Sequence, residues 1–541
     1  MRKLLATAAI ALAAATTAQA DVKLPAIISD NMCVQAEKVL PIWGKADPGE
    51  KVTVTLGDQS QSATAGQDGN WKVMFHAFPD GAGPLEMKVA GKNTLDVKNI
   101  ITGQVWVASG QSNMEFGFNS AHNAAEERPK ANYPKIRIFN LQKKTAFEPQ
   151  WDCVGHWEEC TPETVNHTSA VGYFFARDIH TKLGVPVGLI HTSWGGTSAQ
   201  AWTSLEGLES NPELKDYAQA LEKTKGNISN IEANYKNQQL PRYEEADKKW
   251  KEQYGKADAA TKKAHPEPRK PSSPDNNPGV PSVLFNGMIA PIIPFGIEGA
   301  IWYQGESNAG NAMQYRTLFP TMITDWRNHW AAANPDEKDF PFCFVQLANF
   351  MAREDQPTQG ELGWPGLREA QHMTLKLPNT GEAVIIDIGM SGDIHPKDKM
   401  DVGKRLALAA EHVAYHKDIV FSGPTYQSME VEGNKIRVKF ANVGGGLTIA
   451  AAPSIQAGVP QAEPGKELKG FSIAGDDHKF VWADAKIDGD SVIVSSDKVS
   501  KPVAVRYAWA NNPECNLYNK DGLPASPFRT DDWSGSPASK K

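Results

Sequence analysis

The chain reads Gln104-Val105-Trp106-Val107-Ala108 and, one residue later, Gly110-Gln111-Ser112-Asn113-Met114. The first run predicts a β-strand, because it is short, apolar and followed by a glycine. The serine comes where that strand ends, and in α/β enzymes ligands bind outside the carboxyl ends of the strands. Ser112 is therefore a candidate nucleophile, although a serine in this place also fits the N-cap of a helix.

Strands and helices alternate from about Ile100 to His416. Short apolar runs predict strands, and apolar positions three or four residues apart predict helices. The alternation indicates an α/β fold with a mostly parallel sheet and helices on both of its faces. The expected strands cover residues 104–108, 187–190, 300–303, 342–347 and 383–388, and the expected helices cover residues 169–183, 318–330 and 401–416.

β-rich segments flank this region. Residues 21–99 alternate apolar and polar side chains between closely spaced turn signals, which predicts a β-sandwich-like N-terminal domain. Residues 419–541 alternate in the same way and predict a C-terminal β-rich domain. The α/β domain then spans residues 100–418. Within it, residues 206–280 are polar and predict an exposed helical insert, either a solvated excursion or a lid.

Residues 1–20 have the pattern of a secretory signal peptide. Arg2 and Lys3 precede an apolar run over residues 4–15, and Ala18-Gln19-Ala20 fits the cleavage site. We expect the mature chain to begin near Asp21 and the protein to be periplasmic or secreted. The remaining apolar stretches are too short to predict a membrane span.

Size, charge and cysteine content narrow the class of protein. A chain of 541 residues exceeds what one hydrophobic core supports, so two or three domains are expected. The net charge of -7 argues against nucleic-acid binding, which needs a basic patch. The five cysteines include no Cys-x-x-Cys pair, which argues against a thiolate metal site. Cys153 and Cys160 could form a disulfide in an oxidising compartment.

A histidine and an aspartate follow another apolar run. Asp393-Ile394-His395-Pro396 comes soon after Ala383–Ile386. Proline extends the residue before it, so Asp393 and His395 can point to the same side of the chain. A histidine can take the proton of a serine, and an acid can fix its tautomer and stabilise its charged form. The alternative is a surface turn that caps the next helix.

Two further strand ends carry glycines and amides. Trp194-Gly195-Gly196-Thr197 follows the strand at 187–190, and its glycines allow a backbone N–H to approach an oxyanion. Gln304-Gly305-Glu306-Ser307-Asn308 follows the strand at 300–303 and offers amide donors. Each segment alone fits an ordinary βα turn. Four such segments at strand ends together indicate an active site for acyl transfer.

These four segments resemble the sequence blocks of the SGNH hydrolase superfamily, and closely those of its sialate O-acetylesterase family. The resemblance covers about residues 100–416, and the Gly-x-Ser-x-Gly motif of the α/β-hydrolases is absent. It implies a flavodoxin-like three-layer α/β/α domain, a serine esterase mechanism, and neither a metal nor another cofactor.

The resemblance also assigns roles to residues. Many members of the superfamily place the acid three residues before the histidine. Here Gly392 holds that position and Asp393 lies two residues before His395, so a backbone carbonyl could orient the histidine instead. The implied nucleophile is Ser112, the base His395 and the acid Asp393, and the implied oxyanion hole consists of the Ser112 N–H, the Gly196 N–H and the amide of Gln304, with Asn308 as its substitute.

The resemblance implies removal of O-acetyl groups from sugars, with O-acetylated sialic acid as the expected substrate. Acetylated xylan or another polysaccharide is the alternative substrate. A non-catalytic carbohydrate-binding protein is the alternative of a different class. A sialate carries a carboxylate, which favours an arginine at the site. The available arginines include Arg177, Arg327, Arg353 and Arg368.

Overall fold

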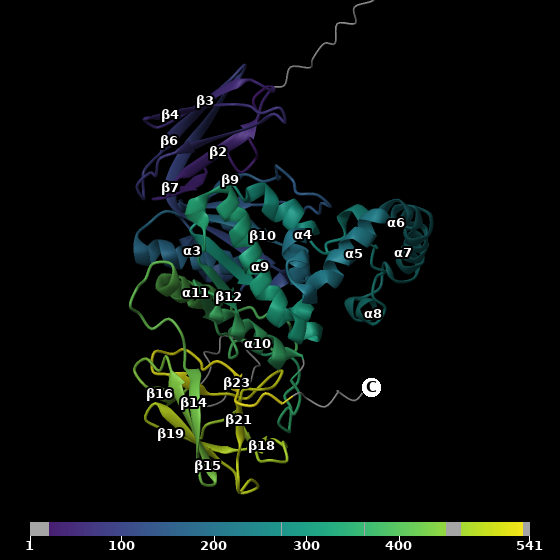
Figure 1. Ribbon diagram of the computed structural model, residues 1–541. Helices are drawn as coiled ribbons and strands as arrows, with labels where there is room; N and C mark the ends of the chain where they lie inside the picture. The colour runs from purple at the N-terminus through teal and green to yellow at the C-terminus, as the bar shows by residue number, and fades with distance from the viewer. Residues whose placement is uncertain (1–20, 272, 362, 451–466, 534–541) are drawn as a thin grey trace, which may run out of the picture.

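The computed structural model describes residues 21–271, 273–361, 363–450 and 467–533. Figure 1 shows three parts in a row: a β-rich N-terminal part, a central part with helices around a sheet, and a β-rich C-terminal part. The expected signal peptide, residues 1–20, lies outside the described residues.

The central sheet has the strand order β13-β12-β11-β7-β10-β8-β9. Neighbouring strands along this path are parallel except β8 and β9, which are antiparallel. The expectation of a mostly parallel sheet is therefore confirmed. The strands are β7 (Thr94–Gly110), β8 (Tyr133–Asn140), β9 (Trp157–Cys160), β10 (Val187–Ser193), β11 (Gly299–Tyr303), β12 (Phe342–Val345) and β13 (Thr380–Ala383).

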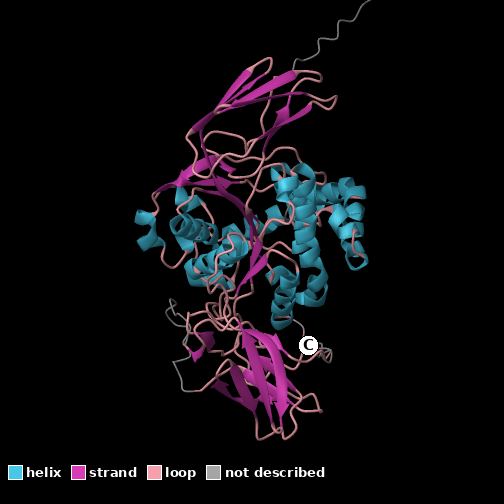
Figure 2. Ribbon diagram, turned by 60° about the vertical axis from the view of Figure 1, so that its left-hand side comes forward, coloured by secondary structure: helices cyan, strands magenta, loops and turns pink. Residues whose placement is uncertain are grey.

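Helices cover both faces of this sheet, as Figure 2 shows. Side chains along β7 alternate between two cores: Val105 and Val107 belong to one, Trp106 and Ala108 to the other. Such alternation is what a strand buried on both faces requires. The first core includes α9 (Ala312–Ala333) and α10 (Trp364–Met373), and the second includes α3 (Ala170–Leu183) and α11 (Lys399–Val413).

Local sequence signals set the ends of these helices. Ser169 caps α3 by accepting a hydrogen bond from the Gly172 N–H at 3.0 Å, and Gly184 ends it in a left-handed conformation. Asp398 caps α11 in the same way, accepting from the Asp401 N–H at 3.1 Å. The three helices expected from periodicity are present, and α9 is longer than residues 318–330.

The N-terminal part is joined to the central sheet through β7. The first half of β7 pairs with β6 and its second half with β10 and β11, so the expected boundary after Asn99 falls inside a single strand. The other strands of this part are β1 (Cys33–Gln35), β2 (Leu40–Lys45), β3 (Lys51–Leu56), β4 (Gln59–Thr64), β5 (Asn70–Phe75) and β6 (Leu85–Ala90).

The C-terminal part contains two four-stranded sheets and a two-stranded one. Apolar side chains of both larger sheets, such as Val438 and Val505, share one hydrophobic core. The strand orders are β14 (Thr425–Glu432), β15 (Lys435–Ala441), β20 (Ser491–Ser495), β19 (Asp484–Asp488); β18 (Val481–Trp482), β17 (Phe471–Ala474), β21 (Ala504–Tyr507), β23 (Phe528–Arg529); and β16 (Leu447–Ile449), β22 (Leu517–Asn519).

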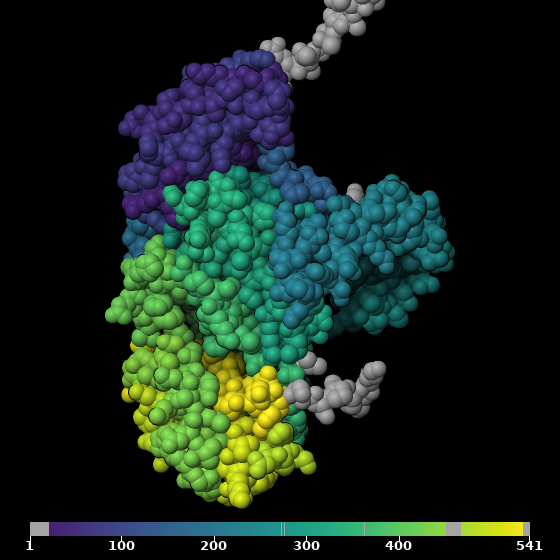
Figure 3. Space-filling view, in the orientation of Figure 1, coloured from purple at the N-terminus to yellow at the C-terminus, as the bar shows by residue number. Residues whose placement is uncertain are grey.

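The polar segment expected to form helices does so. It projects from the central part, as Figure 3 shows, and most of its side chains are exposed. Among the described residues, no helix is both long and apolar enough to cross a bilayer. The insert contains α4 (Leu205–Glu209), α5 (Lys215–Gly226), α6 (Ile228–Asn234), α7 (Leu240–Tyr254) and α8 (Ala259–Ala264).

The strand expected at residues 383–388 is wrong, because β13 covers Thr380–Ala383 and the chain turns after it. The apolar residues that follow pack into two hydrophobic cores instead of extending the strand. Val384 and Ile386 pack in the C-terminal core, whereas Ile385 and Ile388 pack in the core that includes α3 and α11.

A disulfide between Cys153 and Cys160 is also not formed. Both are free buried thiols, and they belong to the cores on opposite faces of the sheet. Burial raises the pKa of each thiol to about 12.

Close contact between α3 and α11 leads to a prediction about stability. A Cβ atom on Gly403 of α11 would lie 2.6 Å from the Phe174 Cβ of α3. We expect Gly403→Ala to destabilise the fold by about 1–3 kcal/mol through overpacking. Thermal unfolding should show a lowered midpoint. Gly226→Ala is the control, because nothing lies within 4 Å of that position, and an unchanged midpoint in Gly403→Ala would contradict this packing.

Candidate active site

The register of three strands brings three polar segments together. Gly110 at the end of β7 pairs with Ser193 of β10 and with Tyr303 of β11. The backbone continues this pairing beyond the strands, since the Trp194 N–H donates to the Gly110 carbonyl and the Gln111 N–H to the Tyr303 carbonyl, each at 3.0 Å. The segments after β7, β10 and β11 therefore leave the sheet side by side.

Gly110 is required for this turn. Its φ of +140° lies in a region that residues with a side chain rarely adopt, and a Cβ there would collide with the Tyr303 carbonyl. The chain can turn so close to β11 because no side chain intervenes. Ser112 is then the first residue of the short helix α1 (Ser112–Glu115) and is half-buried.

The structure places His395 against Ser112. The distance from His395 Nε2 to Ser112 Oγ is 2.8 Å, a normal hydrogen bond. The two residues are 283 positions apart, and His395 belongs to the loop between β13 and α11. When the ring carries its proton on Nδ1, Nε2 accepts the serine proton, which is the arrangement that a general base needs.

Asp393 lies beside His395, as its position in the sequence predicts. Its Oδ1 is 3.6 Å from His395 Nδ1, too long for a hydrogen bond, and it accepts the His395 backbone N–H at 2.9 Å. Both side chains are partly exposed, at 36% for His395 and 43% for Asp393. Asp393 thus fixes the backbone of the histidine loop, and no described backbone carbonyl accepts from His395 Nδ1.

Two backbone donors adjoin Ser112. The N–H groups of Ser112 and Gly196 donate to no acceptor among the described residues. Gly195 packs directly against the serine, since a Cβ on Gly195 would lie 3.2 Å from Ser112 Cβ, and its N–H donates to Glu115 Oε2 at 2.6 Å. The two unengaged N–H groups are available to an oxygen atom of a substrate.

The two candidate amides differ in their hydrogen bonds. Gln304 is fully buried, and its amide nitrogen donates to Asn308 Oδ1 at 2.7 Å and to the Thr197 carbonyl at 3.3 Å. Both of its amide hydrogens are therefore engaged. The Asn308 amide nitrogen donates only to Gln200 Oε1, at 3.1 Å, among the described residues. Asn308 thus retains one free N–H.

Three of the four candidate arginines are engaged in the fold. Arg177 pairs with Glu127, Arg327 donates to the Phe340 carbonyl, and Arg368 donates to four backbone carbonyls. Arg353 is exposed and lies 3.7 Å from Glu514. At the other end of the serine helix, Lys143 Nζ lies 2.5 Å from Glu115 Oε1, a contact that no sequence pattern indicated.

A second serine–histidine contact lies on β10. His191 Nε2 is 2.7 Å from Ser193 Oγ, and its Nδ1 is 3.1 Å from Asn140 Oδ1. Burial lowers the pKa of His191 to about 4, so its ring is neutral at physiological pH. Ser193 is buried, and the Glu115 carboxylate opposes the effect of burial on the pKa of His191.

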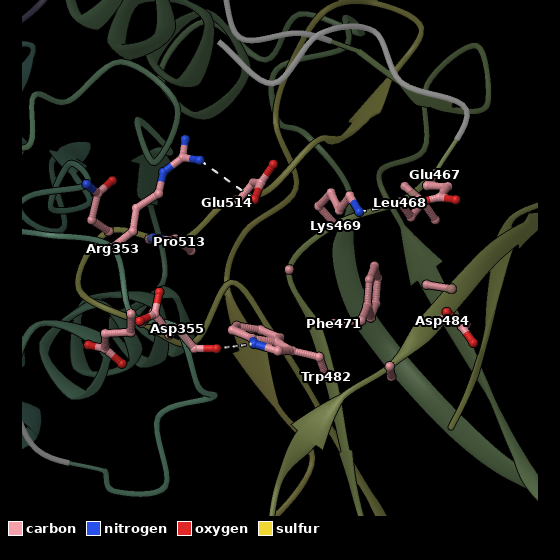
Figure 4. A pocket seen from close by; sticks show the side chains of 16 residues that line it. Arg353, Asp355, Glu467, Leu468, Lys469, Phe471, Trp482, Asp484, Pro513 and Glu514 are labelled. Atoms are coloured by element: carbon pink, nitrogen blue, oxygen red, sulfur yellow. Dashed lines mark hydrogen bonds and ion pairs between the residues drawn. The ribbon is translucent and has the colours of Figure 1, made fainter. Parts of the chain in front are cut away.

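A separate cavity of about 570 Å³ lies between the loop at Arg353 and the C-terminal strands (Figure 4). Trp482 stands at this cavity, with its indole N–H donating to the Asp355 carbonyl at 2.9 Å. Carboxylates outnumber cations among its lining residues, and neither Ser112 nor His395 lines it. In the described part of the chain, no group of three or more histidine, cysteine or acidic residues could hold a metal ion.

Comparisons with known proteins agree on one family. Residues 102–237 match the family described as carbohydrate esterase, sialic acid-specific acetylesterase. The chain is 30% identical to the rat sialate O-acetylesterase over 533 residues, which cover 90% of each chain, and 29% identical to the human one over 93% of this chain and 91% of that protein. A solved structure, a carbohydrate acetylesterase from Xanthomonas citri, is 36% identical with a TM-score of 0.76 and covers 95% of this chain and 100% of that one.

The geometry at Asp393 predicts unequal effects of two substitutions. His395→Ala removes the candidate base and should lower kcat by about 10²–10⁴-fold. Asp393→Ala removes one backbone contact and a long ion pair, and we expect a loss of about tenfold, equivalent to roughly 1.4 kcal/mol. Steady-state kinetics with p-nitrophenyl acetate measure both. Equal losses in the two variants would contradict the lesser role of Asp393.

Proposed function

Because the chain belongs to the sialate O-acetylesterase family of carbohydrate esterases, we propose that it removes O-acetyl groups from sialic acids through a Ser112–His395 mechanism. The protein is a carboxylic ester hydrolase, as its relatives are. The observation that supports the mechanism is the 2.8 Å contact between His395 Nε2 and Ser112 Oγ.

In the proposed reaction, His395 takes the proton of Ser112 while Oγ attacks the acetyl carbonyl. The resulting tetrahedral intermediate collapses to the acyl-enzyme when the bond between the acetyl carbon and the sugar oxygen breaks and His395 protonates that oxygen, so that the sugar leaves with a free hydroxyl. A water molecule, deprotonated by the same histidine, then releases acetate from the acyl-enzyme. Asp393 would keep the histidine loop in place and stabilise the imidazolium through its nearby charge.

The backbone N–H groups of Ser112 and Gly196 would stabilise the oxyanion. The resemblance assigns the third donor to Gln304, with Asn308 as its substitute. The hydrogen bonds favour the substitute, because Gln304 uses both amide hydrogens within the fold and Asn308 retains one. An unengaged donor is needed, since only bonds made to the developing charge lower the barrier.

The domain arrangement is part of the same proposal. We take residues 100–418 as a flavodoxin-like SGNH domain, because parallel strands with helices on both faces carry the site at their carboxyl ends. The N- and C-terminal parts would be β-sandwich-like domains. The pattern of residues 1–20 supports a cleaved signal peptide and a periplasmic or secreted protein.

An acetylated neutral polysaccharide is the second candidate substrate. Arg177, Arg327 and Arg368 already form hydrogen bonds within the protein, so they are not available to bind a sialate carboxylate. This favours an uncharged substrate. Lys143, 40% exposed and next to Glu115, is the cation that could serve a sialate. A non-catalytic carbohydrate-binding protein is disfavoured, because binding does not need a serine bonded to a histidine.

Removal of the nucleophile tests the mechanism. Ser112→Ala should abolish turnover of p-nitrophenyl acetate, because it removes the hydroxyl that would form the acyl-enzyme, while thermal unfolding stays unchanged. Ser193→Ala is the matched control, since that serine also contacts a histidine but is buried. Substantial turnover in Ser112→Ala, or loss of turnover only in Ser193→Ala, would refute the assignment.

Acetate release distinguishes the two substrate classes. We expect the highest kcat/KM on O-acetylated sialic acid, compared with acetylated xylan and acetylated neutral monosaccharides at equal ester concentration. A higher value on either neutral substrate would show that the enzyme acts on uncharged sugars, with Ser112 still as its nucleophile.

A further inference from the structure

Asn113, the residue after Ser112, connects three segments of the site. Its side chain is 1% exposed, and its Oδ1 accepts a hydrogen bond from Lys399 Nζ at 2.5 Å. Its Nδ2 donates to Glu306 Oε1 at 2.5 Å and to the Ile394 carbonyl at 3.0 Å. One amide therefore joins the serine turn to α11, to the segment after β11 and to the histidine loop.

The partners leave this amide a single orientation. A lysine ammonium can only donate, so Lys399 must face Oδ1. The Ile394 carbonyl can only accept, so it must face Nδ2. If the amide were flipped, its nitrogen would face the Lys399 ammonium, donor against donor, and its oxygen would face the Glu306 and Ile394 oxygens, acceptor against acceptor. Lys399 and the Ile394 carbonyl together thus determine which way Asn113 points.

Lys399 is an unusual residue to find in this position. It is fully buried at the start of α11, and its ammonium lies over the rings of Phe116 and Tyr303, 4.7 and 5.1 Å from their centroids. A lysine is almost never fully buried unless it is paired, because its charge loses hydration. The charged groups that face it are Glu306, Asp393 and Asp398.

The electrostatics of the site agree with this geometry. Burial lowers the pKa of Lys399 to about 7, while the three carboxylates act in the opposite direction. Burial also raises the pKa of Glu306, whose Oε2 has no hydrogen-bond partner among the described residues. At a pH below its pKa, Lys399 is an ammonium ion, the form that can only donate to Asn113, and a buried cation that costs stability in this way is expected to serve the site.

We propose that Lys399 and Asn113 are positioning residues, which hold the turn of Ser112 against the loop of His395 at the distance that proton transfer requires. Asn113 follows the nucleophile and Ile394 precedes the base, so the Asn113–Ile394 bond links the immediate neighbours of the two reacting side chains. This inference rests on the proposed function of that pair. A displacement of about 1 Å between reacting groups can cost about 10²-fold in rate.

Two variants of the full-length protein test the inference. Lys399→Met removes the donor that holds Asn113 Oδ1 and keeps most of the side-chain volume. Asn113→Asp keeps an acceptor for Lys399 but loses both donated bonds. Lys397→Met is the control, because that lysine is exposed and lies two residues away. The readouts are kcat and KM for p-nitrophenyl acetate, the rate of covalent labelling by a fluorophosphonate, and the midpoint of thermal unfolding.

In both variants we expect kcat and the labelling rate to fall about 10- to 100-fold, with KM changed by less than about twofold. The control should match the unsubstituted protein. If folded Lys399→Met and Asn113→Asp label and turn over at the unsubstituted rate, the inference is wrong. If Lys399→Met does not fold, Asn113→Asp decides by the same criterion.

The same experiment separates this inference from the proposed function. If the unsubstituted protein is labelled and Ser112→Ala is not, the assignment of Ser112 as the nucleophile is supported, whatever the result for Lys399→Met. Absence of labelling at Ser112 in the unsubstituted protein would instead refute the proposed function.

Discussion

The pairing of β7 with its two parallel neighbours is the constraint on which the site depends. Strand β7 ends at Gly110, which pairs with Ser193 on one side and with Tyr303 on the other, so three segments leave the sheet at one place. Glycine is needed there because any side chain would meet the Tyr303 carbonyl. The position of Ser112 follows from the sheet, whereas the position of His395 depends on a loop that must be held from elsewhere.

That loop is held by contacts that mostly do not involve the reacting atoms. Asp393 accepts the His395 backbone N–H, and Asn113 donates to the Ile394 carbonyl. Asp393 is partly exposed and Asn113 is buried. We expect the bond from Asn113 to hold the loop more strongly, because water competes less for a buried hydrogen bond. The candidate site thus combines a serine turn positioned by the sheet with a loop held on both sides of His395, the proposed base.

The order of strands and helices and the grouping of Ser112, His395 and Asp393 could be predicted from the sequence. Periodicity and turn residues carry that information locally. The end of β13 could not be predicted, because Val384 and Ile386 are apolar but pack in the C-terminal core instead of extending the strand. The burial of Lys399 could not be predicted either, because a lysine near the start of a helix is usually exposed. Gln304 and Asn308 are distinguished only by partners on distant segments.

The identity of the labelled residue tests the central claim most directly. The full-length protein would be treated with a fluorophosphonate, digested and analysed by mass spectrometry for the modified peptide. The account predicts one adduct, on Ser112, that does not form in His395→Ala on the same timescale. An adduct on Ser193 or on another residue, or equally fast labelling of Ser112 without His395, would contradict it.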